Sequence, residues 1–123
     1  MNIEKTVYNS KAIAVVSGGG HEVAEVNAAL DLVMSARYIA GSNLIAIEKS
    51  VLDERFFILS TGFAGEVLQK FINYHCKAAI YGDFSRYTSK PLHDFIYESN
   101  RGKDVFFVST KQEALERLCA AAE

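Results

Sequence analysis

Short apolar runs alternate along this chain with segments in which apolar residues recur every three or four positions. The first pattern is typical of buried strands, and the second is typical of helices with one apolar face. Residues 44–47 (LIAI) and 105–108 (VFFV) show the first pattern, and residues 62–74 show the second. A chain that alternates in this way is expected to belong to the α/β class, with helices covering a largely parallel sheet.

The predicted elements follow the order β-β-α-β-α-β-α-β-α. Residues 6–8 and 12–16 flank the turn-forming Asn9-Ser10-Lys11 and predict a β-hairpin. The remaining strands are predicted at residues 44–47, 77–81 and 105–108, and the helices at residues 22–38, 62–74, 89–100 and from 110 onward. Because parallel strands need crossover connections, we expect a mostly parallel five-stranded sheet with helices packed over it.

Helical spacing also predicts which face of each helix is buried. The expected inward stripes are Val23, Val26, Leu30, Val33 and Arg37 in the first helix; Ala64, Val67, Leu68 and Phe71 in the second; Leu92, Phe95, Ile96 and Ser99 in the third; and Ala114, Leu115, Leu118 and Cys119 in the fourth. Phe63, Asn73 and Tyr74 lie off the stripe of the second helix. The segment 50–59 is irregular but rich in large apolar side chains, so we expect it to pack against the core.

Composition and charge bound the class of protein. With 123 residues, half of them apolar and 23% charged, the chain is expected to form a single α/β domain over residues 1–123. A net charge of -2, spread along the chain, gives no basic surface for a nucleic acid. No stretch reaches the roughly 20 apolar residues of a membrane span, and residues 1–10 lack the apolar core of a signal peptide. We therefore expect a cytoplasmic protein that binds neither nucleic acid nor membrane.

Isolated cysteines and histidines give no metal or redox signal. Cys76 and Cys119 lack CxxC spacing, and His21 and His75 have no ligand spacing. We expect reduced thiols, no metal and no cofactor.

The sequence argues against hydrolase chemistry. His93 and Asp94 are adjacent on a helix and therefore point in different directions, and Ser60 has no GxSxG context. The sequence favours a non-enzymatic protein and leaves an enzyme as the alternative.

Ligands of open α/β sheets bind at the carboxyl ends of strands, so four segments are candidate ligand sites: residues 17–21, 50–62, 82–89 and 109–110. Gly18, Gly19 and Gly20 could let a phosphate approach backbone amides, although the loop lacks both the Walker and the GxGxxG patterns and a flexible turn is the alternative. The loop 82–90 carries the polar residues Asp83, Ser85, Arg86 and Lys90. Its alternative interpretation is a local turn with Phe84 packed beneath the third helix.

Ser60-Thr61-Gly62 stands where the chain enters the second helix. Either hydroxyl could cap free backbone amides there. A hydroxyl at a helix amino terminus is also a favourable place for a phosphate, because the helix dipole stabilises negative charge. Both interpretations stay open, as an ordinary cap and as a modification site.

Residues 60–71 (STGFAGEVLQKF), 82–85 (GDFS) and 94–100 (DFIYESN) resemble a bacterial family known as domain of unknown function 4180. The resemblance covers nearly the whole chain and is strongest from about residue 56 to residue 108. It implies a bacterial cytoplasmic protein with no established activity.

The element order and the position of Ser60-Thr61-Gly62 are also similar to STAS domains, which have the anti-sigma-factor-antagonist fold. Those domains carry Asp-Ser-Ser/Thr-Gly at the same helix start, and a partner kinase phosphorylates the first serine to switch binding. Leu59 stands here where that motif has aspartate. The likeness implies a STAS-like fold and a regulatory switch at Ser60 or Thr61.

The leading hypothesis is therefore a non-enzymatic regulatory domain that binds another protein around the second helix. Its candidate residues are Ser60, Thr61, Gly62, Phe63, Asn73 and Tyr74. The alternative is a small-molecule or nucleotide-binding domain, or an enzyme, that uses the glycine loop 18–20 and the loop 82–89. Self-association stays open under either hypothesis.

Overall fold

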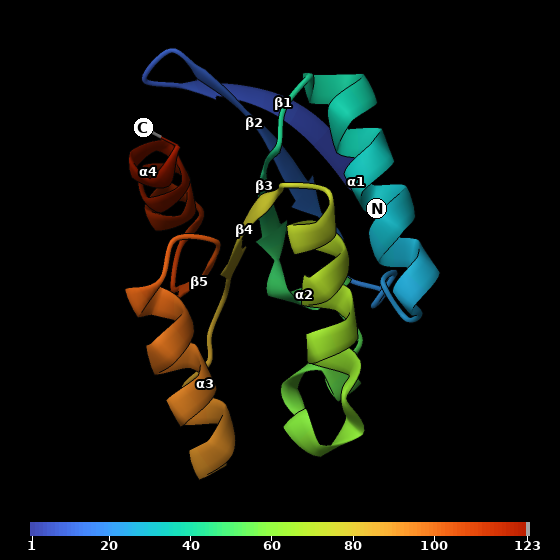
Figure 1. The fold of residues 1–123 in the computed structure, drawn as a ribbon, viewed down its shortest axis with the longest axis vertical. Coiled ribbons are helices and arrows are strands. Elements are labelled where there is room, and N and C mark those ends of the chain that lie inside the picture. Colours follow the sequence, from blue (N-terminus) through green and yellow to red (C-terminus); the bar gives the residue numbers. More distant parts are fainter. Residues whose placement is uncertain (123) are drawn as a thin grey trace.

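The computed structural model describes residues 1–122 and contains one five-stranded sheet with four α-helices (Figure 1). The strands are β1 (Asn2–Tyr8), β2 (Lys11–Ser17), β3 (Leu44–Glu48), β4 (Lys77–Tyr81) and β5 (Val105–Val108). The helices are α1 (Val26–Ala40), α2 (Phe63–Asn73), α3 (Lys90–Arg101) and α4 (Lys111–Ala121). The predicted order and the mostly parallel sheet are confirmed.

The strands lie side by side in the order in which they occur along the chain. β1 is antiparallel to β2, and each later neighbouring pair is parallel. Because crossovers between parallel strands have one hand, a sheet that grows in one direction places its connecting helices on one face. Two separate cores agree with this arrangement: one contains residues of α1, α2 and α3, and the other contains residues of α4.

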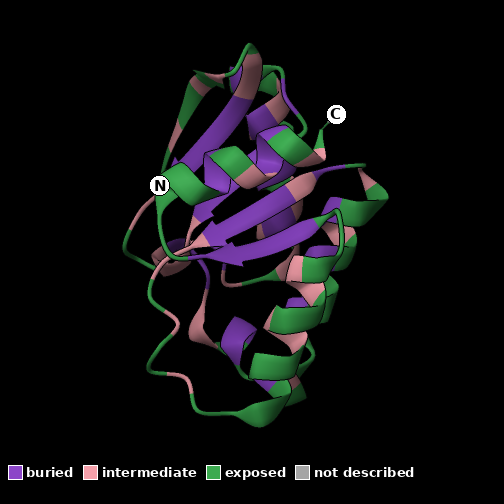
Figure 2. Ribbon diagram, turned by 90° about the vertical axis from the view of Figure 1, so that its left-hand side faces the viewer, coloured by how far each residue is buried: buried purple, intermediate pink, exposed green. Residues whose placement is uncertain are grey.

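Alternate residues of the central strands point into these two cores. In β3, Ile45 and Ile47 pack toward the three helices, whereas Leu44 and Ala46 pack toward α4. All four side chains are buried. Figure 2 shows buried residues along the central strands and exposed residues on the outer faces of the helices. Burial on both faces explains why these strands read as uninterrupted apolar runs.

The β1–β2 hairpin is confirmed, but its turn is shorter and β1 is longer than predicted. Tyr8 pairs with Lys11, so the turn consists of Asn9 and Ser10 alone. Both residues have positive φ (48° and 69°), which is the backbone of a tight type I′ turn. β1 extends back to Asn2 because an edge strand accommodates polar residues that face solvent.

Helix α1 starts later than predicted, and its inward stripe was predicted only in part: of the five residues, Val23 and Val33 are buried. Residues 22–25 precede the helix, and Val23 forms a parallel bridge with Leu52. The buried residues of α1 are Ala29, Leu32, Val33, Ala36 and Ala40, whereas Val26, Leu30 and Arg37 are half-buried. Alanines let the helix approach the sheet closely, and a pattern read from large side chains misses them.

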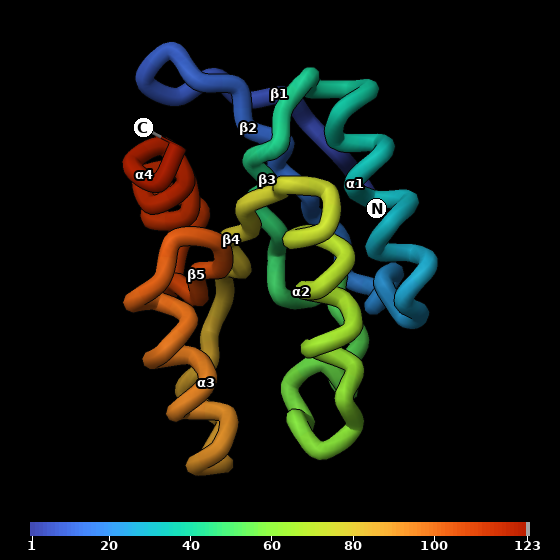
Figure 3. The backbone as a smooth tube through the Cα atoms, viewed as in Figure 1, coloured from blue at the N-terminus to red at the C-terminus, as the bar shows by residue number. Residues whose placement is uncertain are grey.

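The predicted faces of α2 and α4 are confirmed, since all eight predicted inward residues are buried. In α3 only Leu92 is buried, while Phe95, Ile96 and Ser99 are half-buried. Helix α3 packs on β5, the edge strand, so its inner face is less enclosed. Figure 3 shows α3 at one side of the molecule, with α2 lying between it and α1.

The irregular segment after β3 forms three short 3₁₀ helices, at Lys49–Val51, Glu54–Phe57 and Leu59–Thr61. Val51, Leu52, Phe56 and Phe57 are buried in the helix-side core, as predicted. Cys76 and Cys119 are both buried and free. Among the described residues, no helix has the length and apolarity needed to cross a bilayer.

The different burial of Phe71 and Phe95 predicts different costs on truncation. Phe71 is 1% exposed in α2, so Phe71→Ala is expected to lower the free energy of unfolding by about 3–5 kcal/mol. Phe95→Ala should cost clearly less, because its side chain is only half-buried. Urea denaturation measures both, with Ile72→Ala on the exposed face of α2 as the control. Equal losses at Phe71 and Phe95 would contradict this account of α3.

Candidate functional site

The loop that precedes α2 presents one exposed hydroxyl and one that is structurally engaged. Ser60 is exposed on the last 3₁₀ turn. The Thr61 hydroxyl accepts the Phe63 N–H at 3.2 Å and donates to the carbonyl of Ile58 or Arg55. Gly62 occupies the N-cap position in the left-handed region, with φ 76°. Thr61 therefore holds the turn, and Ser60 is left facing solvent.

The six residues predicted around α2 do not form one patch. Ser60, Thr61 and Gly62 lie at its start, whereas Asn73 and Tyr74 lie at its end. These ends are roughly 16 Å apart along an 11-residue helix. The prediction that Phe63 faces outward is wrong, since its side chain is only 6% exposed.

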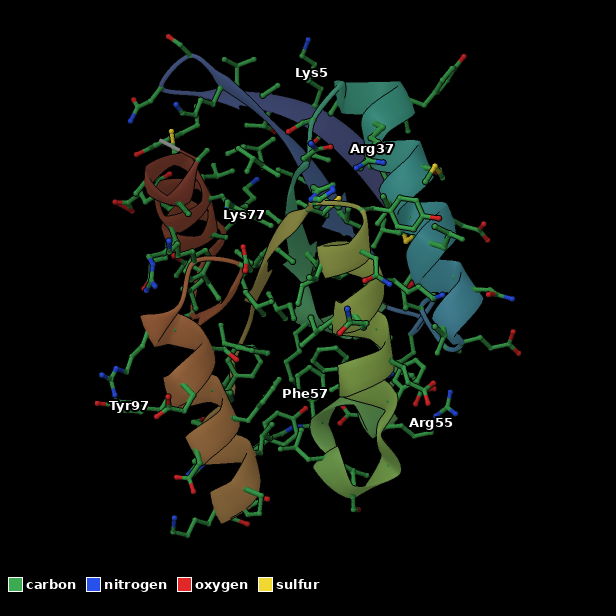
Figure 4. The ribbon with its side chains drawn as sticks, in the orientation of Figure 1. Lys5, Arg37, Arg55, Phe57, Lys77 and Tyr97 are labelled. Carbon is green, nitrogen blue, oxygen red and sulfur yellow. The ribbon has the colours of Figure 1, made fainter. Side chains whose placement is uncertain are left out.

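Two arginines cover aromatic rings at the ends of α2. The Arg55 guanidinium lies 4.7 Å from the ring centroid of Phe63, so the long side chain of Arg55 shields this ring from water. At the other end, Arg37 of α1 bonds to the Tyr74 carbonyl and lies 5.7 Å from the Tyr74 ring. Figure 4 shows Arg55 beside the start of α2 and Arg37 reaching toward its end.

Hollows lie on both sides of α2. One, of about 580 Å³, includes Val26 of α1 and Lys70 of α2 in its lining. The other, of about 330 Å³, lies against α3 and includes Leu68 and Phe95. Gly65 and Gln69 line both hollows, so the two adjoin on the exposed face of α2.

A third hollow, of about 540 Å³, lies at the carboxyl ends of β3 and β4. Its lining residues are His21, Glu48, Lys49, Ser50, Glu54, Tyr81, Gly82, Asp83 and Arg86. Loops at this edge of a parallel sheet are where α/β proteins commonly place ligands. We refer to it below as the carboxyl-edge hollow.

The glycine loop beside this hollow directs its amides at the chain's own carboxylates. Gly18 N–H donates to Glu48 Oε1 at 3.1 Å, and Gly20 N–H donates to Glu22 Oε1 at 3.2 Å. Backbone N–H donors hold the pKa of Glu22 below its usual value. Two of the three glycine amides thus already have anionic acceptors, which argues against a phosphate there.

The loop after β4 is a local turn built around Asp83. The Asp83 carboxylate accepts the Ser85 N–H at 2.9 Å and the Ser85 hydroxyl at 2.6 Å, and these bonds lower the Asp83 pKa. Phe84 packs among the rings of Phe57, Tyr87 and Phe107. The local-turn interpretation describes this loop well.

The predicted ligand residues of that loop divide between the hollow and the surface. Asp83 and Arg86 line the carboxyl-edge hollow, and Arg86 pairs there with Glu54. Ser85 and Lys90 are not among its lining residues, and Lys90 pairs with Asp94 on α3.

Ser60, His93 and Asp94, for which the sequence predicted no catalytic triad, make no hydrogen bonds to one another among the described residues. His93 Nε2 contacts the Tyr87 carbonyl, and Asp94 accepts from Lys90. The described residues include no group of three or more histidine, cysteine or acidic side chains arranged to hold a metal ion.

Sequence reasoning placed His21 in a candidate loop without giving it a role, and it missed Glu48, Lys49 and Tyr81 as residues of the hollow. His21 has φ 51°, uncommon for a residue with a side chain, and its Nδ1 lies 2.7 Å from the Leu52 carbonyl. Because a carbonyl only accepts, Nδ1 carries the proton, and Nε2 is the acceptor of the neutral ring. Two buried apolar strands end in polar residues at Glu48, Lys49 and Tyr81. This change from apolar to polar residues is the sequence signal that could have identified them.

Gly82 is expected to be needed for the shape of the hollow. Its φ is 155°, and a Cβ added there would lie 2.8 Å from Lys49 Cβ. Gly82→Ala should therefore lower the free energy of unfolding by about 1–3 kcal/mol. Gly19→Ala, where an added Cβ meets nothing within 4 Å, is the matched control. Chemical denaturation that finds both variants equally stable would contradict the close approach of Gly82 to Lys49.

Comparison with known proteins identifies the family. No curated protein and no solved structure matches the chain. The sequence model of the family described as Domain of unknown function (DUF4180) matches residues 8–118, which is nearly the whole chain. The chain therefore belongs to the family Domain of unknown function (DUF4180).

Proposed function

We propose that this chain is a non-enzymatic regulatory domain that binds another protein through the exposed face of α2. The observation that carries this proposal is the surface formed by the two hollows that meet across Gly65 and Gln69. This surface has a hollow on each side of α2, and Gly65 between them has no side chain to fill the space. A partner could therefore contact three helices at once.

The exposed apolar residues around α2 support a protein partner. Ile72, on the outer face of α2, is 44% exposed and lines the hollow against α3. Ile58, just before the Ser60 turn, is 54% exposed. Apolar side chains that line a hollow can be buried in the core of a protein–protein interface, where charged residues are depleted.

A STAS-like fold is part of the proposal. The alternating order, the single antiparallel strand and the Ser60-Thr61-Gly62 turn before α2 support the likeness. Leu59 in place of the aspartate of the STAS motif is the main departure. A kinase that modifies this chain would therefore have to recognise a different sequence.

Ser60 is the better candidate for a phosphorylation switch than Thr61. Its hydroxyl is exposed, whereas the Thr61 hydroxyl is bonded to the backbone on both sides of the turn. Ser60 shares a hollow of about 420 Å³ with Arg86, whose guanidinium would attract an added phosphate. A phosphate there would change the charge at one end of the proposed binding surface without entering the core.

The binding surface is tested by changing its central residue. An added Cβ at Gly65 meets nothing within 4 Å, so Gly65→Arg should fold while filling the surface. Wild type, Gly65→Arg, Gly65→Ala and Ala120→Arg are used to capture partners from a lysate of the source organism. Ala120→Arg is the control, because Ala120 is exposed on α4, on the opposite face of the sheet. A protein retained by all except Gly65→Arg would support the proposal. A partner held equally by Gly65→Arg, or no specific partner, would contradict it.

The switch is tested at Ser60 and Thr61. Ser60→Ala should change stability by less than about 0.5 kcal/mol, because Ser60 is exposed, whereas Thr61→Ala should cost about 1 kcal/mol through loss of its turn bonds. Ser60→Asp should keep the fold and change retention of the captured partner. Equal retention by wild type, Ser60→Ala and Ser60→Asp would show that Ser60 is no switch.

A further inference from the structure

The carboxyl-edge hollow brings together two opposite charges that do not pair with each other. Glu48 ends β3 and Lys49 follows it, and both side chains line the hollow. Among residues 1–122, neither of them belongs to an ion pair. Of the other charged residues of the hollow, Glu54 and Arg86 pair with each other, and the Asp83 carboxylate accepts the Ser85 N–H and hydroxyl.

Glu48 is held in place by neutral donors. Its Oε1 accepts the Gly18 N–H at 3.1 Å and lies 2.9 Å from the Ser50 hydroxyl, which is also placed to donate to the Gly18 carbonyl. These contacts involve one carboxylate oxygen, so Oε2 remains as an acceptor for a further partner. The negative charge is also felt by its neighbour, because burial and then Glu48 raise the pKa of Tyr81. Glu48 is thus a fixed, uncompensated anion at one side of the hollow.

Lys49 is held in place by aromatic rings and by Gly82. Its ammonium lies 4.9 Å from the ring centroid of Tyr87 and 5.6 Å from that of Phe57. The stem of the side chain packs against Gly82, where a Cβ would leave no room. Rings stabilise the cation through their faces but do not accept its three N–H bonds as an oxygen would. The ammonium is therefore positioned and still able to donate to an oxygen acceptor.

We propose that the carboxyl-edge hollow binds a small zwitterion of the amino-acid type, with its ammonium group on Glu48 and its carboxylate on Lys49. A volume of about 540 Å³ lies within the roughly 300–1,000 Å³ of small-molecule sites. A molecule with both charges satisfies both side chains, whereas an ion of one sign satisfies one and meets repulsion from the other. In the neutral form of its ring, His21 Nε2 adds a further acceptor for an ammonium or hydroxyl group of the ligand.

This site is separate from the two hollows of the proposed protein-binding surface, and it shares only Arg86 with the hollow that contains Ser60. None of its lining residues belongs to the two hollows beside α2. Loss of partner binding in Gly65→Arg and loss of zwitterion binding in a Glu48 or Lys49 variant are therefore independent results.

Calorimetric titration of the purified chain tests the site. The probes are the common α-amino acids and linear aminoalkanoates from glycine to 6-aminohexanoate, each beside the alkylamine and alkanoate of the same length. At least one zwitterion should bind saturably, and its two single-charge analogues should bind about tenfold more weakly or not at all. Absence of saturable binding by every zwitterion, or equal binding by a single-charge analogue, would overturn the proposal.

Variants then assign the binding to these two residues. Glu48→Gln and Lys49→Met should each weaken the zwitterion about tenfold or more, and Glu98→Gln and Lys90→Gln, outside the hollow, should leave it unchanged. If Glu48→Gln lowers the melting temperature, the site is tested instead by the amide NMR shifts of the wild-type chain on addition of the zwitterion. Shifts centred on Gly18 and Gly82 support the site; shifts elsewhere overturn it.

Discussion

Burial of the central strands on both faces is the constraint on which the rest of this structure depends. β3 and β4 have neighbours on both edges and helices on both faces, so nearly all their side chains must be apolar. Such strands leave polar residues only at their ends. Glu48 and Tyr81 stand at those ends, paired across β3 and β4, and the carboxyl-edge hollow begins there. The polar chemistry of the hollow is thus a consequence of how the core is built.

The sequential strand order has a second consequence for where ligands can bind. In doubly wound sheets, the crevice for a nucleotide opens where the strand order reverses. Here β2 to β5 follow one another without a reversal, and three helices share one face. Binding features must then come from loops or from helix surfaces. The hollows beside α2 and the carboxyl-edge hollow are of these two kinds.

Elements with strong local signals were predictable from the sequence. β4 and β5 have the predicted bounds, and α4 buries the four predicted residues after its Thr110 cap. Periodicity failed in α1, where Val23 leaves the helix to bridge Leu52, a contact between residues far apart in the sequence. It failed also at Phe63, which is packed in the helix-side core and has the Arg55 guanidinium over its ring.

The candidate site was less predictable than the fold, because its residues are joined by tertiary contacts alone. The glycine loop was a candidate phosphate site, yet the Gly18 N–H donates to Glu48, which is distant in the sequence. Lys49 carried no motif, and its fixed position depends on Tyr87 and Gly82 from a loop that follows another strand. The aromatic rings stabilise the Lys49 ammonium only in part. The unpaired Glu48 and Lys49 therefore favour a ligand that brings both missing charges, and no local pattern in the sequence could have indicated this.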